Sequence, residues 1–252
     1  MSEFVLDPGL LVILGVIALS AFATEGAIGF GGTVLAASIG AQLVPLDVLL
    51  PAFVPLNLVM STWLLGRGFS AIAWRMLAVE VAPAVGVGAA LGLALFHVPA
   101  KHVLAFGFGV FVVGLATLQL ARPTGKPLPR PLQWLLLGLG GVAHGLFGTG
   151  GPMIVYVVRR RLPDKRAFRS TLAVLWLVLN TALLINFASA RLYTSTAFTA
   201  LGVIALVIVP GLYIGERVHH KLDAARFERV VWAVLLVAGL ALAIRYGSSL
   251  GS

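Results

Sequence analysis

The sequence predicts an all-α polytopic membrane protein. Of its 252 residues, 60% are hydrophobic and only 11% are charged, and the mean hydropathy is +1.03. A soluble globular domain carries about 25% charged residues. Charge-free stretches also recur along nearly the whole chain. Water therefore cannot be the main solvent, and a multi-pass protein of the inner (plasma) membrane is expected.

The charge-free stretches have the length of membrane-spanning helices, which need about 20 apolar residues. They cover residues 48–66, 81–100, 102–121, 131–158, 170–190 and 192–215, with a shorter stretch at 230–244. The stretches show no alternation of apolar and polar residues, so helices are favoured over the strands of a β-barrel.

The charge and the cysteine count exclude several classes of function. The net charge is +9, but the basic residues cluster in short loops beside apolar spans, where they set orientation in the membrane. No soluble domain exists to bind nucleic acid, so membrane lipid is the expected partner of these charges. The chain has no cysteine, which excludes disulfides and thiolate metal sites. We expect no metal and no cofactor.

The chain contains an internal repeat. Residues 26–32 and 145–151 both read GxxGxGG, 119 positions apart, and Asn57 and Asn180 follow in matching apolar stretches. The glycine motif and the asparagine follow one another in the same order in both copies, which indicates a duplication.

A polar segment rich in proline and charge, residues 122–131, separates the two copies. We therefore expect two homologous transmembrane repeats, residues 1–125 and 126–252, within one integrated membrane domain.

The basic residues predict that the repeats are inverted. If each glycine-rich segment is a broken helical hairpin that enters and leaves on one face, about three transmembrane helices remain in each repeat. Of the 18 Lys and Arg residues, Lys101, Arg191 and Arg245 then fall on the side of the N-terminus and the other 15 on the opposite side. Positive charge marks the cytoplasmic side, so both termini are expected outside. If each glycine-rich segment is instead one simple span, the chain crosses the membrane eight times, and the same charges are divided less unevenly between the two sides.

The glycine motifs are the main candidates for a binding site. Four glycines in seven residues break a membrane helix, and the freed backbone N–H groups can face an anion. Close helix packing is the alternative. Together with polar residues in the apolar spans, the substrate-binding candidates are Gly29, Gly31, Gly32, Thr33, Asn57, Gly148, Thr149, Gly150, Gly151 and Asn180.

Glu25 and His144 are candidates for ion coupling. Each directly precedes the first glycine of its motif, so the two stand at equivalent positions of the repeats. Ionisable residues at membrane depth are costly and are functional by default. Glu25 can instead be a helix-capping acid, and His144 can be satisfied by a backbone carbonyl. No catalytic residue is assigned.

Other charged residues are expected at the membrane surface. The basic residues of segment 159–169 are interpreted as an orientation signal that can also gather anions at the inner mouth. Glu80, Glu216, His97, His219 and His220 lie near expected helix ends and are interpreted as interfacial.

The sequence resembles the TauE/SafE sulfite exporter family over nearly its whole length. The resemblance rests on four segments, at residues 24–32, 143–152, 165–171 and 211–222. It implies export of sulfite, an organosulfonate or a related small anion.

The predicted function is therefore a secondary transporter that exports a small anion. The chain lacks the ATP-binding pattern GxxxxGK[ST], so an ion gradient, such as that of protons, would have to drive export. A passive anion channel fits the same features. An intramembrane enzyme fits less well, since the chain has no GxSxG or HExxH motif, and we expect no enzymatic activity.

Overall fold

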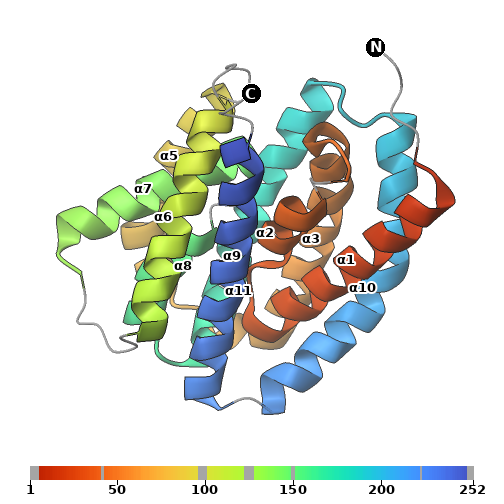
Figure 1. Cartoon of the computed structure of the whole chain (residues 1–252). Helices are drawn as coiled ribbons and strands as arrows, with labels where there is room; N and C mark the ends of the chain where they lie inside the picture. Colours follow the sequence, from red (N-terminus) through yellow and green to blue (C-terminus); the bar gives the residue numbers. More distant parts are fainter. Residues whose placement is uncertain are drawn as a thin grey trace.

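The computed structural model describes residues 6–40, 43–95, 101–121, 128–148, 151–221 and 223–248, and these fold into helices without a strand (Figure 1). Five helices within this part of the chain are long and apolar enough to cross a membrane: Pro8–Ile28, Leu46–Ala71, Trp74–Ala94, Lys165–Ser189 and Ser195–Lys221. Trp232–Ser248 is a shorter apolar helix. The predicted all-α membrane fold is confirmed.

The helices of the first half follow the expected order of a broken hairpin and further long helices. They are α1 (Pro8–Ile28), α2 (Gly32–Leu35), a π-helix (Ala36–Gly40), α3 (Leu46–Gly68), a 3-10 turn (Phe69–Ala71), α4 (Trp74–Met76), a second π-helix (Leu77–Val81), α5 (Ala82–Ala94) and α6 (Lys101–Ala121).

The second half repeats this order with fewer interruptions. Its helices are α7 (Arg130–Phe147), α8 (Gly151–Arg161), α9 (Lys165–Ser189), α10 (Ser195–Lys221) and α11 (Ala224–Ser248). The side chain of Asp164 caps α9 by accepting from the Ala167 N–H at 2.7 Å. The end of α11 and the α9–α10 turn lie at the upper end of the bundle in Figure 1, and the α10–α11 turn lies at the lower end.

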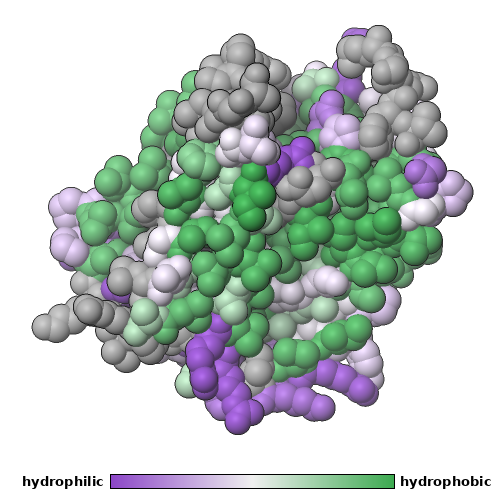
Figure 2. Space-filling view, viewed as in Figure 1, coloured by the Kyte–Doolittle hydropathy of each residue, from purple (hydrophilic) through white to green (hydrophobic). Residues whose placement is uncertain are grey.

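Apolar side chains cover most of the face seen in Figure 2, and hydrophilic residues gather at its lower edge, where α10 and α11 meet. Exposed apolar residues such as Leu206, Val209 and Ile244 are 70 to 78% accessible. An apolar surface of this extent requires a lipid environment.

The opening helix of each half packs along a helix of the other half. α1 lies on α10, and α7 lies on α5. A Cβ atom on Gly215 would be 2.8 Å from the Cα of Gly26, so these backbones touch. Gly92 and Gly145 bring α5 and α7 together in the same way. Small residues permit this approach between membrane helices.

Two further packings, α3 on α9 and α6 on α11, join equivalent helices of the two halves in opposite directions. In α6 and α11, Gly247 lies beside Phe106, whereas Gly239 lies beside Val112. In α3 and α9, the end of α3 at Gly68 meets the start of α9 at Ser170. Antiparallel packing of equivalent helices is the arrangement that two inverted halves would produce.

Candidate functional site

The first glycine motif ends α1 and reverses the chain. Gly29 (φ 84°) and Gly31 (φ 92°) both have the left-handed backbone that glycine adopts without strain. After them, α2 runs back along α1, since a Cβ atom on Gly32 would be 2.8 Å from the carbonyl oxygen of Ala21. The motif thus forms a broken helical hairpin.

The second motif breaks the chain in the same way. Gly148 has φ 64° and caps the end of α7. The tips of the two hairpins meet: a Cβ atom on Gly148 would be 3.8 Å from the Thr33 methyl carbon, and one on Gly151 would be 3.6 Å from the Phe30 ring. Two segments more than 100 residues apart in sequence therefore form one site.

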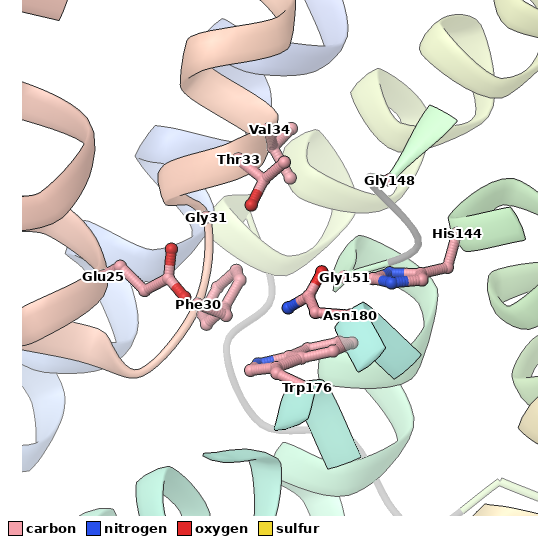
Figure 3. A pocket seen from close by; sticks show the side chains of 10 residues that line it. All are labelled: Glu25, Phe30, Gly31, Thr33, Val34, His144, Gly148, Gly151, Trp176 and Asn180. Atoms are coloured by element: carbon pink, nitrogen blue, oxygen red, sulfur yellow. The ribbon is translucent and has the colours of Figure 1, made fainter. Parts of the chain in front are cut away.

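A small cavity lies where the tips meet (Figure 3). It has a volume of about 20 Å³, room for about one water molecule. Its walls come from α1, the two breaks, α2, α7, α8 and α9, and its lining residues are Glu25, Phe30, Gly31, Thr33, Val34, His144, Gly148, Gly151, Trp176 and Asn180.

Glu25 occupies one side of the cavity and caps the restarting helix. Its carboxylate accepts a hydrogen bond from the backbone N–H of Thr33, near the beginning of α2. The residue is 4% exposed, and its Oε2 atom has no hydrogen-bond partner. The side chain is therefore both a cap and a buried acid with one oxygen still available.

His144 lies on the opposite side of the cavity from Glu25 (Figure 3). Its ring stacks on Trp176, with the ring centroids 5.7 Å apart and the planes 12° from parallel. It is 4% exposed, and Nε2 has no hydrogen-bond partner. A buried ring nitrogen thus remains able to bond to whatever enters the cavity.

The two asparagines have different surroundings. Asn180 lies between Glu25 and His144 in Figure 3, and its Oδ1 atom has no partner. Asn57 instead donates from Nδ2 to the hydroxyl of Thr33 at 2.7 Å and does not line the cavity. Asn57 therefore supports the site through Thr33, whereas Asn180 faces it.

The end of α1 is held by three side chains. The last carbonyl groups of a helix lack partners within the helix. Arg169 donates to the Gly26 oxygen at 2.8 Å, and the Trp176 indole donates to the Gly29 oxygen at 3.0 Å. His219 Nδ1 lies 2.8 Å from the Ala27 oxygen, which can only accept, so Nδ1 carries the proton.

The profile of the sulfite exporter TauE/SafE family matches residues 13–242 of the chain. The chain belongs to this family. It is also 27% identical, over 180 residues, to a protein named probable inner membrane transporter protein TsaS of Comamonas testosteroni, a match that covers 70% of this chain and 75% of the relative. No solved structure matches the chain. This TauE/SafE protein is therefore a multi-pass inner-membrane protein of a transporter family.

The structure of the TauE/SafE chain brings together most of the predicted site residues. Those that line the cavity are Glu25, Gly31, Thr33, His144, Gly148, Gly151 and Asn180. Gly29, Gly32 and Asn57 lie beside it, through the contacts given above. Thr149 and Gly150 lie outside the described residues. Their role in substrate binding stays a prediction.

Sequence reasoning missed three lining residues, Phe30, Val34 and Trp176. Phe30 lies within the first motif, and Trp176 stands one helical turn before Asn180, so helical spacing was the available signal.

The expectation that Arg169 and His219 lie at the surface was wrong. They are only 7% and 5% exposed, because they reach the carbonyl groups that the break in α1 leaves free.

Proposed function

We propose that this TauE/SafE protein is a secondary transporter that exports a small anion, sulfite or an organosulfonate, through the cavity between the hairpin tips. Membership of the family and the similarity to a probable inner membrane transporter support transport. The observation that carries the choice of site is the presence of unpartnered polar atoms at one buried point: Glu25 Oε2, His144 Nε2 and Asn180 Oδ1.

Unpartnered buried polar atoms favour a polar ligand. Each one costs about 1 to 3 kcal/mol when it is left without a hydrogen bond. A protonated Glu25 and an N–H group of His144 can donate to an oxyanion, and the amide of Asn180 offers a donor after rotation by half a turn. An anion with several oxygens can accept from all three side chains, which offsets this cost.

The size of the cavity indicates that transport needs motion. At about 20 Å³ it holds about one water molecule, and a sulfur oxyanion is larger. Binding therefore separates the two hairpin tips. The antiparallel packing of α3 on α9 and of α6 on α11 supports two inverted halves, which is the arrangement that permits alternating access around a central site.

Transport assays in proteoliposomes test this function. We expect accumulation of sulfite, thiosulfate, sulfoacetate or taurine, with chloride as the reference anion, when a proton gradient is imposed. Accumulation against a gradient separates a transporter from a passive channel, which only equilibrates the anion.

The matched variants are Asn180→Ala and Thr181→Ala. Thr181 is the next residue, but it is exposed and its hydroxyl bonds its own helix at Leu177. Asn180→Ala should lower the rate of uptake at least about 10-fold, the effect of roughly 1.4 kcal/mol. Thr181→Ala should transport as the unmodified protein does. Equal rates in both variants would remove Asn180 from the site.

A further inference from the structure

One face of α9 carries, in order along the helix, a charged residue, two residues that line the cavity, and two apolar residues. Arg169, Trp176, Asn180, Leu183 and Phe187 are spaced by seven, four, three and four residues, so they share a face of the helix. Trp176 and Asn180 line the cavity. At 1.5 Å per residue, Arg169 lies about 10 Å from Trp176 along the helix axis, toward the basic end.

Arg169 is packed against the first glycine break. A Cβ atom on Gly29 would be 2.5 Å from the Cγ of Arg169, and the guanidinium group donates to the Gly26 oxygen at 2.8 Å. Its other terminal nitrogen lies 3.0 Å from the Glu216 carboxylate on α10. The arginine therefore links α9, α10 and the end of α1.

Glu216 is shared by several basic side chains. Besides Arg169, it lies 3.9 Å from Arg67 and 3.1 Å from His220. Lys165 reaches the same end of α10, where it donates to the His219 carbonyl at 2.9 Å. One carboxylate thus faces a group of basic side chains, and a surplus of positive charge attracts anions.

We propose that Arg169 and Glu216 form a charge gate on the basic side of the cavity, in which an incoming oxyanion replaces Glu216 as the partner of Arg169. The inference rests on the proposed function, because the oxyanion is its substrate. A guanidinium group binds carboxylates and other oxyanions through the same pair of parallel N–H groups. Glu216 keeps Arg67 and His220 as partners when Arg169 is taken.

Opening of the gate frees the end of α1. Once the anion draws the guanidinium group away from Gly26 and Glu216, the first hairpin tip loses one of the side chains that hold its carbonyl groups. The tip can then move away from the second tip and enlarge the cavity. Arg169 therefore binds the incoming substrate and also holds the first hairpin tip in its closed position.

The opposite side of the cavity has no such arginine among the described residues. When Asn57 is aligned with Asn180, Leu46 and Phe53 take the places of Arg169 and Trp176. On that side Leu50, Val54, Leu183 and Phe187 form an apolar cluster with Ala37, and Leu46 packs against it. An anion is thus bound on the basic side of the cavity and meets an apolar barrier on the other side. This asymmetry fits a transporter that receives its substrate from the cytoplasm.

Labelling of a single introduced cysteine tests the gate without any transport measurement. The chain has no cysteine, so Val34→Cys places one thiol in the cavity wall, where Val34 is 3% exposed. A membrane-impermeant thiol reagent is added to one side of the membrane at a time. Glu216→Gln should raise the labelling rate from the basic side about 10-fold, as expected when roughly 1.4 kcal/mol is removed from the closed state.

The matched control is Glu80→Gln, which removes the carboxylate of a different pair, Arg161–Glu80 at 2.5 Å. It should leave the labelling rate unchanged, and Glu216→Gln should not alter labelling from the opposite side. Equal labelling in Glu216→Gln and the parent, or equal increases from both sides, would overturn the gate. Either result leaves the proteoliposome assay, and so the proposed function, untouched.

A second variant and a ligand keep the proposal testable if Glu216→Gln folds poorly. Arg169→Lys keeps the charge and loses the planar fork, so it should also raise labelling from the basic side about 10-fold. Methanesulfonate, an unreactive oxyanion, should raise the labelling rate of the parent, because it opens the gate. It should have several-fold less effect on Arg169→Lys. A purely structural arginine predicts the same response to methanesulfonate in both proteins, and that result would also overturn the proposal.

Discussion

The side chain of Trp176 connects the two glycine breaks. Its indole N–H donates to the carbonyl oxygen of Gly29 at 3.0 Å, and the face of the ring stacks on His144, the last-turn residue of α7. One residue of α9 therefore positions the tip of the first hairpin and the histidine of the second.

Replacing Trp176 by phenylalanine separates these two contacts. Trp176→Phe keeps an aromatic ring next to His144 and removes the donor to Gly29. We expect a loss of stability of about 1 kcal/mol, the usual contribution of one hydrogen bond. The measurement is thermal unfolding of the purified protein in detergent. Trp74→Phe is the control, because Trp74 is 49% exposed, and a matching loss there would mean that the Gly29 contact adds nothing.

The second prediction concerns the backbone of the first break. Gly31 has φ 92° and is the residue before α2, so a β-branched side chain there is strained by about 1 to 3 kcal/mol. Gly31→Val should abolish transport while the protein still inserts into the membrane. Gly86→Val is the control, since Gly86 lies in α5 with open space around it. If Gly31→Val transports the anion at the normal rate, the glycines of this motif serve helix packing and not substrate binding.

The third prediction concerns Glu25 and pH. An ionised Glu25 repels an anion in a low-dielectric interior, and a protonated Glu25 donates to it. Anion binding should therefore strengthen as the pH falls, because protonation removes the repulsion. Glu25→Gln is a permanent neutral donor, so it should bind the anion with little dependence on pH and lose proton-driven accumulation.

Asp47→Asn is the matched control for Glu25→Gln, because Asp47 is an exposed acid near the beginning of α3. It should keep the pH dependence of the unmodified protein. If Glu25→Gln accumulates the anion with unchanged pH dependence, the carboxylate acts only as the cap of α2. His144→Gln provides the second arm, and loss of coupling in both variants would support exchange of a proton between the equivalent positions.

The fourth prediction is the topology. From the division of 15 basic residues against Lys101, Arg191 and Arg245, we expect residue 126 in the cytoplasm and residue 250 outside. Topology reporters fused at these two positions should give opposite locations. Reporters on the same side would contradict the inverted arrangement and favour eight simple crossings.

The sequence was sufficient to predict the helical membrane fold and much of the cavity wall. Apolar stretches of about 20 residues without alternation predict spanning helices directly, because only helices and closed β-barrels satisfy the backbone in lipid and a barrel strand would show alternation. The glycine motifs predicted the breaks, since Gly29, Gly31 and Gly148 have backbone angles that other residues rarely adopt. The equivalent positions of Glu25 and His144 then placed both residues at one cavity.

The contacts around the end of α1 could not be predicted in the same way. Arg169 and His219 stand near helix ends in sequence, where basic residues normally meet lipid headgroups. Only the placement of α9 and α10 around the end of α1 shows that the carbonyl group of Gly26 lies within reach of Arg169, and that of Ala27 within reach of His219. Such distances depend on tertiary structure, for which local sequence carries no pattern.

The glycine contact between α1 and α10 has a consequence for biosynthesis. α1 is made before α2 to α9 and α10 after them, so the surface around Gly26 can meet Gly215 only after all of those helices have been translated. During that time, lipid or the insertion machinery has to cover a helix that ends in a broken turn. The end of α1 therefore has all its contacts only when α10 enters the bilayer, and a chain that stops after α9 lacks both the Gly215 contact and the bond from His219 to Ala27.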